Sequence, residues 1–302
     1  MMSSQPLVSI IMNCYNGQSY LKDALNSIVS QTYQNWELIF WDNCSNDSSS
    51  SIFEKFNDKR FKYFLANKHT TLYEARNLAI QKSNGSFIAF LDTDDMWLPN
   101  KLEKQIPLFD DDSVGLVYGN IWLLNKKNII KKKKILTKKK LSKGNITKSL
   151  LNDYKMPVIS IVIRKAFLPD ITNVFNAKYD LLADFDFSIN FSLKHKFDCI
   201  QDPVAIYRRH EFQLSRKLFG KQVKQLEAWA LKIKLNSKNN SFDLSSIENE
   251  IKYMKIINLI YEKRWLRSLS EIYKHPLNLN KIKLITILVL PNYILRFFRD
   301  FT

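Results

Sequence analysis

The chain has 302 residues with 45% apolar and 13% aromatic side chains, which excludes a disordered polypeptide and fits one large domain or two small ones. Three widely spaced cysteines, an odd number, argue against a disulfide framework and indicate a reducing compartment. The net charge of +17 is uneven: residues 1–125 carry 10 Lys and Arg against 14 Asp and Glu, whereas residues 126–302 carry 36 against 15. The basic second half predicts an anionic partner (a membrane surface, a phosphorylated substrate or nucleic acid) unless it only reflects a residue bias of the genome.

Apolar runs and amphipathic segments alternate over the first 91 residues. The N-terminus has no basic region before its apolar run, so 7–12 is predicted as a first strand and not as a signal peptide. Further strands are predicted at 36–41, 61–65 and 87–91, and helices from Ser19, near 52–56 and over 72–82. This alternation predicts an α/β fold with a mostly parallel, doubly wound sheet flanked by helices.

Three carboxylates follow the strand predicted at 87–91. Along an extended backbone Asp92 and Asp94 leave on the same side, so two negative charges lie close together. Ligands of open α/β sheets collect beyond the carboxyl ends of the strands, and Mg²⁺ is typically held by one or two carboxylates with substrate phosphates. The segment therefore predicts a metal–diphosphate site. The alternative is that Asp94 or Asp95 merely caps the next helix.

Polar residues also follow the first two predicted strands. Asn13, Tyr15 and Asn16 come after the first strand, and Asp42 comes after the second. At a shared sheet edge, an aromatic ring, a carboxylate able to accept from a base N–H and a metal-holding pair are the parts needed to bind a nucleoside diphosphate. The chain has no glycine-rich phosphate loop, so a metal must neutralise the phosphates.

The segments PLVSIIMNCYNG, WDNCSNDSS and EARNLAIQKSNGSFIAFLDTDDMWLPNKLEKQ, in this order and at these separations, resemble the family 2 glycosyltransferases of the GT-A fold. The resemblance covers roughly residues 6–216. It implies that Asp94 binds a divalent metal, Mg²⁺ or Mn²⁺, on the diphosphate of a nucleotide sugar, and that Asp92 lies near the ribose or the metal. The nucleotide-binding residues that it implies are Asn13, Tyr15, Asn16, Asp42, Arg76 and Asp92, with Asp95 on the donor side.

One motif departs from the pattern of the resembled family. The family usually has Asp-Asp-Gly-Ser after the second strand, and this chain has Asp42, Asn43, Cys44 and Ser45. The first acid is kept, and the second acid and the glycine are lost.

A lysine-rich segment lies in the middle of the chain. It follows a helix predicted over 97–109 and a strand predicted over 114–124, and ten of the eighteen residues from 126 to 143 are lysine. Runs of like charge normally face water, so a solvated hairpin or loop is one interpretation, and a contact with an anionic membrane or acidic acceptor is the other. Nucleic acid is disfavoured because no aromatic residue is interleaved with the lysines.

A second group of acids lies in the segment LLADFDFS, residues 181–188. Asp184 and Asp186 stand beside apolar residues, which can raise a carboxyl pKa, or either acid is a helix N-cap. In the resembled family this position usually reads Glu-Asp-x-Asp, which implies that Asp184 is the general base and Asp186 lies on the acceptor side. Ala183 replaces the usual Glu.

The segment YRRH, residues 207–210, resembles the closing motif of the same family. It implies that His210 completes the metal shell or contacts the diphosphate, and that Arg208, Arg209 or Arg216 neutralises phosphate. Without that resemblance, a histidine beside arginines is interpreted as a surface group.

The last part of the chain, 219–302, is predicted to be helical and basic with a polar break at 236–246. Its apolar segment 282–299 is interrupted by Pro291 and Asn292, whereas a bilayer-spanning helix needs about 20 apolar residues. With lysine and arginine around it, this segment is predicted either to lie in the interface of an anionic membrane or to pack on the catalytic domain.

These residues and the resemblance predict three parts: a nucleotide-sugar half of a GT-A domain at 1–125, an acceptor half with the catalytic base at 126–218, and a helical region at 219–302. The predicted function is an inverting, metal-dependent glycosyltransferase that uses a nucleotide sugar, in the first place a UDP-sugar. Its acceptor is a hydroxyl of a glycan or a lipid-linked precursor in cell-surface polysaccharide synthesis, and its place is cytoplasmic, peripheral at the inner face of the membrane. The alternatives are a nucleotidyltransferase, which would release pyrophosphate, and a basic non-enzymatic protein that binds anionic lipid or nucleic acid.

Overall fold

The computed structural model describes residues 5–125, 132–210, 213–236, 242–274 and 279–289. The chain divides into two compact units. The first unit comprises Met1–Leu150 and Tyr154–Arg208, and the second comprises Leu151–Asp153 and Arg209–Thr302.

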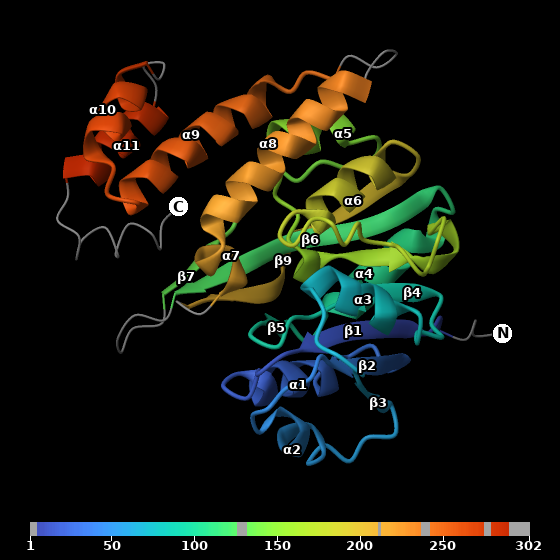
Figure 1. The fold of residues 1–302 in the computed structure, drawn as a ribbon. Coiled ribbons are helices and arrows are strands. Elements are labelled where there is room, and N and C mark those ends of the chain that lie inside the picture. Colours follow the sequence, from blue (N-terminus) through green and yellow to red (C-terminus); the bar gives the residue numbers. More distant parts are fainter. Residues whose placement is uncertain (1–4, 126–131, 211–212, 237–241, 275–278, 290–302) are drawn as a thin grey trace. The chain divides into compact units, whose positions relative to one another are not determined.

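The first unit is built on a mixed sheet, nine-stranded in the described residues, with helices packed against it (Figure 1). Its strands are β1 Val8–Cys14, β2 Trp36–Asp42, β3 Phe61–Leu65, β4 Phe87–Phe90, β5 Met96–Trp97, β6 Val114–Asn125, β7 Lys132–Ile135, β8 Val162–Arg164 and β9 Lys196–Arg209. The strand order is β3-β2-β1-β4-β8-β6-β9-β5, and β7 pairs with β6.

The helices up to residue 192 connect these strands. The α-helices are α1 Leu21–Val29, α2 Ser49–Phe53, α3 Leu72–Ile80, α4 Lys101–Gln105, α5 Thr147–Asn152 and α6 Ala183–Ser192. Three short 3-10 helices are η1 Ile106–Asp110, η2 Val158–Ser160 and η3 Lys165–Phe167.

Strands β1 to β4 form the parallel half of the sheet. β1 pairs in parallel with β2 and β4, and β2 pairs in parallel with β3. The residues of β1, β2 and β4 are almost continuously apolar and buried, as expected of strands that helices cover on both faces. The register pairs Cys14 with Asp42 and Ile11 with Phe90, so the carboxyl ends of these strands meet at one edge. The predicted parallel α/β arrangement is confirmed for this half.

Two helices of this half begin at other residues than the sequence indicates. α1 begins at Leu21, because the Gly17 carbonyl accepts the N–H groups of Tyr20 and Leu21 in a turn, so Ser19 is not its N-cap. α2 begins at Ser49, three residues before the predicted start, and the Asp47 carboxylate accepts the Ser49 N–H at 2.9 Å. Local hydrogen bonds to loop residues therefore set both starts.

The other half of the sheet contains antiparallel pairs. β8 pairs antiparallel with β4 and β6, and β5 pairs antiparallel with β9. The helix predicted from residue 97 is wrong at its start, since Trp97 belongs to β5 and its indole N–H donates to the Ile159 carbonyl at 3.0 Å. Pro99 disfavours a helical backbone at the residue before it, and α4 begins only at Lys101.

The described part of the lysine-rich segment contains a strand. β7 pairs antiparallel with β6, so Lys132 lies opposite Asn125, and Lys133 and Lys134 are exposed. This agrees with the interpretation of a solvated hairpin for the described lysines. Residues 126–131 lie outside the described residues.

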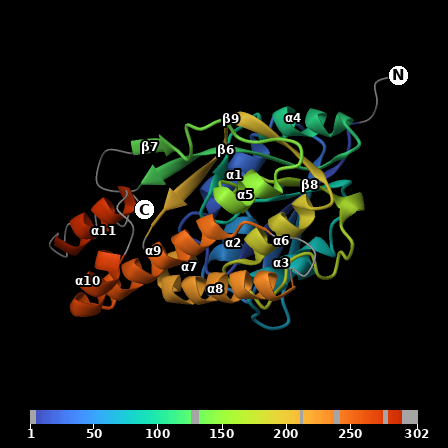
Figure 2. The ribbon, with the colours of Figure 1, turned by 90° about the horizontal axis from the view of Figure 1, so that it is seen from above.

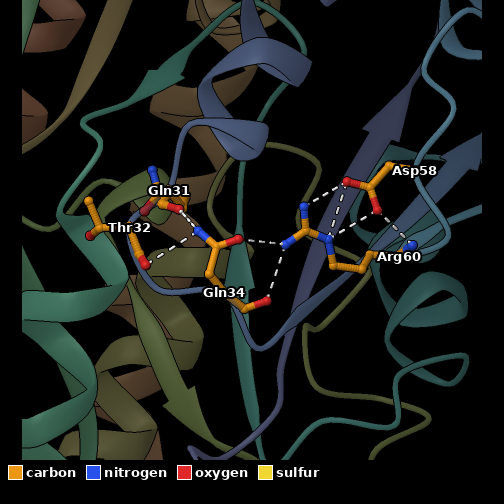
Figure 3. A network of polar contacts seen from close by, with 5 residues as sticks. All are labelled: Gln31, Thr32, Gln34, Asp58 and Arg60. Carbon is orange, nitrogen blue, oxygen red and sulfur yellow. Dashed lines mark hydrogen bonds and ion pairs between the residues drawn. The ribbon is translucent and has the colours of Figure 1, made fainter.

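A polar network fastens the chain at the entry to β2 and β3, as Figure 3 shows. Arg60 forms an ion pair with Asp58 at 2.7 Å and donates to the carbonyl and side-chain oxygens of Gln34 at 3.2 Å. Its guanidinium also lies 3.6 Å from the centroid of the Trp36 ring. These contacts join the turn before β3 to the loop before β2, and they lie at the amino ends of the strands, away from the edge where the acids gather.

A second polar network at the same end surrounds the nearly buried carboxylate of Glu37. It accepts hydrogen bonds from the Ser9 hydroxyl at 2.6 Å, the Asn84 N–H at 2.6 Å and the Lys62 ammonium at 2.6 Å. Burial by itself would raise the pKa of Glu37, but the bonds from Lys62, Ser9 and Asn84 outweigh it and lower the pKa to about 2. The ionised form of Glu37 is therefore part of the folded structure.

We expect Glu37→Gln to lower the free energy of unfolding at pH 7 by about 3 kcal/mol, the stabilisation that a pKa lowered from 4.5 to about 2 represents. Because the folded pKa lies below the unfolded one, this stabilisation is present above pH 4.5 and is lost as the pH falls toward 2. Urea unfolding at pH 7 and at low pH measures it. Glu54→Gln, at an exposed glutamate, should change little at either pH. An equal loss for Glu37→Gln at both pH values would contradict the expectation.

The second unit is helical in its described residues. Its helices are α7 Leu214–Lys217, α8 Phe219–Asn236, α9 Ser245–Tyr261, α10 Trp265–Lys274 and α11 Leu279–Val289. α8 and α9 lie side by side (Figure 1 and Figure 2) and run antiparallel, because Lys255 pairs with Glu227 and Lys234 pairs with Glu248. Among the described residues no helix is long and apolar enough to cross a bilayer.

Candidate functional site

The carboxyl ends of β1, β2 and β4 bring the predicted site residues to one edge of the sheet. The Leu91 N–H donates to the Ile11 carbonyl at 3.1 Å, and the Asn43 N–H donates to the Cys14 carbonyl at 2.8 Å. Asn13, Asp42 and Asp92 therefore follow or end neighbouring strands. The side-chain amide of Asn13 is buried, and neither of its polar atoms has a hydrogen-bond partner among the described residues, so it can bind a ligand group.

Arg76 of α3 links two of the predicted acids. Its side chain is 3% exposed and forms an ion pair with the carboxylate of Asp92, whose side chain is 30% exposed. Asp184, at the start of α6, is close enough for Arg76 to lower the pKa of its carboxyl group. Asp92 and Asp184 thus face the same guanidinium, although 92 positions separate them in the sequence.

Asp184 is held in place by its surroundings. Burial raises its pKa, and the charge of Arg76 and a hydrogen bond from the Tyr73 hydroxyl partly offset that rise. One carboxylate oxygen also accepts the Phe185 N–H at 2.9 Å. The N-cap of α6 is Leu182, so the alternative in which Asp184 or Asp186 is the N-cap is wrong. A carboxylate with a raised pKa and fixed orientation is suited to accept a proton.

We expect Tyr73→Phe to move the acid limb of the pH profile of kcat/KM to higher pH. The change removes a hydrogen bond that lowers the pKa of Asp184, so the base stays protonated to a higher pH. The ring that lies 5.0 Å from the Arg76 guanidinium is kept. The control is Tyr118→Phe, which removes a hydroxyl bonded to the Ser142 carbonyl at 2.6 Å and should leave the limb in place. An identical shift in both variants would contradict the assignment.

The loop after β4 concentrates negative charge. Asp94 is half-buried and Asp95 is 1% exposed. Burial, followed by the charges of Asp94 and Asp92, raises the pKa of Asp95. One Asp95 oxygen accepts the Arg208 N–H at 2.8 Å, and the other is buried without a hydrogen-bond partner in the described part of the chain. The N-cap of α4 is Asn100, so the alternative in which Asp94 or Asp95 caps that helix is wrong.

The donor set of this loop fits a hard divalent cation. Across the described ranges no group of three or more His, Cys, Asp or Glu is placed to hold a metal by itself. Asp92 and Asp94 supply two carboxylates, the number that Mg²⁺ sites typically take from protein when substrate phosphates complete the shell. After burial, the negative charges of Asp94 and Asp92 contribute to the raised pKa of Asp95, and a cation relieves repulsion of this kind.

A second part of the edge has aromatic and polar side chains. Tyr15 is 54% exposed, and its ring centroid lies 4.2 Å from that of His69. Asp42 is 2% exposed and accepts the Tyr63 hydroxyl at 2.7 Å and the Ser45 N–H at 2.8 Å. Sequence reasoning missed Tyr63 and His69, which come from β3 and the loop after it. The polar residues that follow 61–65 are the signal that could have found His69.

The loops after β1 and β2 bind each other. The Asn16 N–H donates to the Ser45 hydroxyl at 3.0 Å, and its side-chain oxygen accepts the Asn46 N–H at 2.9 Å. Cys44, which stands where the resembled family has glycine, has a φ of 66°, so the left-handed backbone is retained without the glycine. Asn16 therefore has structural contacts of its own at this edge, and Cys44 keeps the turn conformation.

Arg208 and Asp186 have polar side-chain contacts of their own. Arg208 is buried, with its guanidinium 2.9 Å from the carboxylate of Asp23 and 4.4 Å from the centroid of the Tyr20 ring. Asp186 accepts from the Asn190 amide at 3.2 Å. Arg209, His210 and Arg216 belong to the second unit, and their roles in metal or phosphate binding stay predictions.

Comparisons of sequence connect this arrangement with known proteins. A sequence model of the family described as "Glycosyl transferase family 2" matches residues 9–168, more than half of the 302 residues. The Escherichia coli protein "UDP-Glc:alpha-D-GlcNAc-diphosphoundecaprenol beta-1,3-glucosyltransferase WfgD" is 39% identical over 126 residues, 42% of this chain and 50% of that protein. A glycosyltransferase of the same description from E. coli, WfaP, is 36% identical over 39% of this chain and 47% of its own. The chain thus spans about half the length of these relatives.

Two solved structures share the fold. S. aureus TarS 1-349 in complex with UDP-GlcNAc superposes with a TM-score of 0.59 at 17% identity, over 89% of this chain and 81% of that one. The mannosyltransferase PcManGT from Pyrobaculum calidifontis, in complex with GDP-Man and Mn²⁺, gives a TM-score of 0.63 at 14% identity, over 99% and 84%. At these identities the likeness concerns the fold, and the predicted GT-A fold is confirmed.

Proposed function

Because this chain belongs to glycosyl transferase family 2, we propose that it transfers a sugar from a nucleoside diphosphate sugar to a hydroxyl group of a glycan or lipid-linked acceptor. The observation that carries the proposal is the position of Arg76, which pairs with Asp92 on the donor side and lies near Asp184. The edge that would bind a nucleotide and the carboxylate that would take a proton are thus joined through one buried cation.

The proposed reaction is a direct displacement. The Asp184 carboxylate accepts the proton of the acceptor hydroxyl while that oxygen forms a bond to the anomeric carbon. The bond from that carbon to the diphosphate breaks, and the nucleoside diphosphate leaves with the electron pair. Attack opposite the leaving group inverts the anomeric configuration. Arg76 holds its positive charge beside both acids, and Tyr73 orients the Asp184 carboxylate by its hydrogen bond.

The proposed cofactor is Mg²⁺ or Mn²⁺. Asp92 and Asp94 would hold it, with His210 a further predicted ligand. When bound, the ion stabilises negative charge on the departing diphosphate. The ion pair with Arg76 restrains the Asp92 carboxylate, which stays partly exposed.

Side chains at the part of the sheet edge that contains Tyr15 support the proposal that a nucleotide binds there. Tyr15 and His69 offer exposed rings, and the unpartnered amide of Asn13 offers a donor and an acceptor. We propose a UDP-sugar as the donor, in line with the UDP-Glc in the name of the relative WfgD and the UDP-GlcNAc bound to TarS. Residues 1–125 would bind the donor and 126–218 the acceptor, in cell-surface polysaccharide synthesis at the inner face of a membrane.

The test compares the purified chain with its Asp94→Ala variant. We expect one of UDP-, GDP- or dTDP-sugars to raise the Tm of the wild type in the presence of Mn²⁺ and to be hydrolysed slowly to a nucleoside diphosphate. Asp94→Ala should abolish the metal-dependent part of both effects, since half of the carboxylate pair is gone. Asp112→Ala, at a fully exposed acid, should behave as wild type. Donor binding that is unchanged in Asp94→Ala would favour a non-enzymatic binding protein, and release of pyrophosphate would favour a nucleotidyltransferase.

A further inference from the structure

The second unit carries an exposed apolar stripe on α10. Leu266, Leu269 and Tyr273 are 86%, 51% and 85% exposed. Their spacing of three and four residues places them on one face of the helix. Single exposed apolar side chains are ordinary, but three neighbours on a ten-residue helix form a patch that favours contact with another apolar surface. We call these three residues the α10 stripe.

The α10 stripe is separate from the core that holds α9, α10 and α11 together. That core consists of Ile256, Ile257, Ile260, Ile272, Leu284 and Ile287. α10 contributes Ile272, which is 4% exposed, and Ser268 is also buried. The helix therefore packs by one face and leaves the adjoining apolar face to solvent, so the stripe is not needed to build the bundle.

The segment that contains the α10 stripe is rich in cationic side chains. Residues 262–289 contain six Lys and Arg against two Asp and Glu. The Lys281 ammonium donates to the Tyr273 carbonyl at 2.8 Å and lies 5.7 Å from the centroid of the Tyr273 ring. Arg267 and Lys283 are exposed, and they form no ion pair among the described residues.

Further aromatic and apolar residues of α10 and α11 are exposed in the second unit. Trp265, at the start of α10, is 38% exposed. Ile282 follows Lys281 in α11 and is 57% exposed, and Ile285 is 46% exposed. An apolar face with Trp, Tyr and Leu beside Lys and Arg is the composition of helices that lie in the plane of a membrane interface.

From these observations we propose that the α10 stripe docks the chain in the headgroup region of an anionic membrane. Lipid supplies both complements at once: acyl chains for Leu266 and Leu269, and anionic headgroups for Arg267, Lys281 and Lys283. A second copy of the chain is a poorer partner, because residues 209–302 carry 18 Lys and Arg against 8 Asp and Glu and repel their like. This docking rests on the proposed function for its membrane setting. The docking itself requires no transfer chemistry.

The position of this surface differs from the one that the sequence suggests. The apolar segment at 282–299 is the predicted interfacial element, and 290–302 lie outside the described residues. In the described part of the chain the largest exposures of apolar side chains in this region belong to Leu266 and Tyr273 of α10. In residues 265–274 polar side chains separate short groups of one or two apolar ones, so the segment has no long apolar run to reveal it.

The experiment is co-sedimentation of the full chain with vesicles of phosphatidylglycerol and phosphatidylcholine, compared with vesicles of phosphatidylcholine alone. We expect binding to the anionic vesicles that weakens with salt, and at least a roughly tenfold loss of affinity for Leu266→Glu/Leu269→Glu. The matched control is Leu231→Glu/Leu235→Glu on α8, where two leucines are 57% and 71% exposed, and it should bind as wild type. Arg267→Glu/Lys283→Glu should lower affinity for anionic vesicles only.

Three results would overturn the proposal. They are wild-type protein that binds neither vesicle, equal losses in the α8 and α10 variants, and a wild-type dimer that becomes monomeric in Leu266→Glu/Leu269→Glu while vesicle binding is unchanged. Stabilisation by the nucleotide sugar, measured on the same samples, shows that the variants are folded. It also separates the two proposals, because loss of vesicle binding with intact donor binding concerns the stripe alone.

Discussion

Asp184→Asn is expected to lower kcat by roughly 10²- to 10⁴-fold, the usual contribution of a positioned general base. Asparagine keeps the shape and can still accept the Phe185 N–H, but its amide cannot take a proton from the acceptor. Donor binding should stay near the wild-type value, because the role proposed for Asp184 is to take a proton from the acceptor, and this role needs no contact with the nucleotide. Single-turnover transfer and donor titration measure the two effects separately.

The matched control for this prediction is Asp170→Asn. Asp170 is an exposed acid of the same unit whose carboxylate accepts the Thr172 hydroxyl at 2.6 Å. The Asp170→Asn variant carries the same chemical change away from Arg76. Its turnover should therefore equal that of the wild type. If Asp184→Asn retained wild-type turnover, the proposed displacement would have no base and would have to be abandoned.

Arg76→Met is expected to cost about 3–5 kcal/mol of stability and to move the acid limb of kcat/KM to higher pH. Removing one partner of a buried ion pair leaves Asp92 without its counter-charge, which is the costly way to break such a pair. The guanidinium also lowers the pKa of Asp184, so its loss raises that pKa further and keeps the base protonated to a higher pH. Urea unfolding and a pH series of initial rates measure these outcomes.

Arg60→Met is the control that separates a loss of stability from an effect on the pKa of the base. Arg60 also holds an ion pair, with Asp58, but it lies at the amino ends of the strands (Figure 3). Its loss should destabilise the fold without moving the acid limb. Arg76→Lys should move the acid limb less than Arg76→Met does, because the positive charge remains while the planar guanidinium that binds a carboxylate is lost. A normal pH profile in Arg76→Met would refute the link between Arg76 and the base.

The sequence predicts the donor edge well because that edge is assembled from local patterns. Each buried strand of the parallel half is a short apolar run, and polar residues follow it directly, so strand alternation alone brings Asn13, Asp42 and Asp92 together. The same local reasoning fails at Trp97, which has helix-like neighbours yet pairs as β5 with β9. A partner strand about a hundred residues later decides that backbone, and no short window of sequence contains it.

The chain by itself determines the class of fold, the positions of the parallel strands along the sequence and the acids that follow them, because hydrophobic periodicity and strand ends are local properties. Only the tertiary structure decides that Arg76 pairs with Asp92 and lies near Asp184, that Tyr73 donates a hydrogen bond to the base, and that α10 leaves Leu266, Leu269 and Tyr273 in solvent. These are contacts and exposures between elements distant in sequence. They depend on how side chains pack together in the folded protein. The spacing of residues along the chain does not specify that packing.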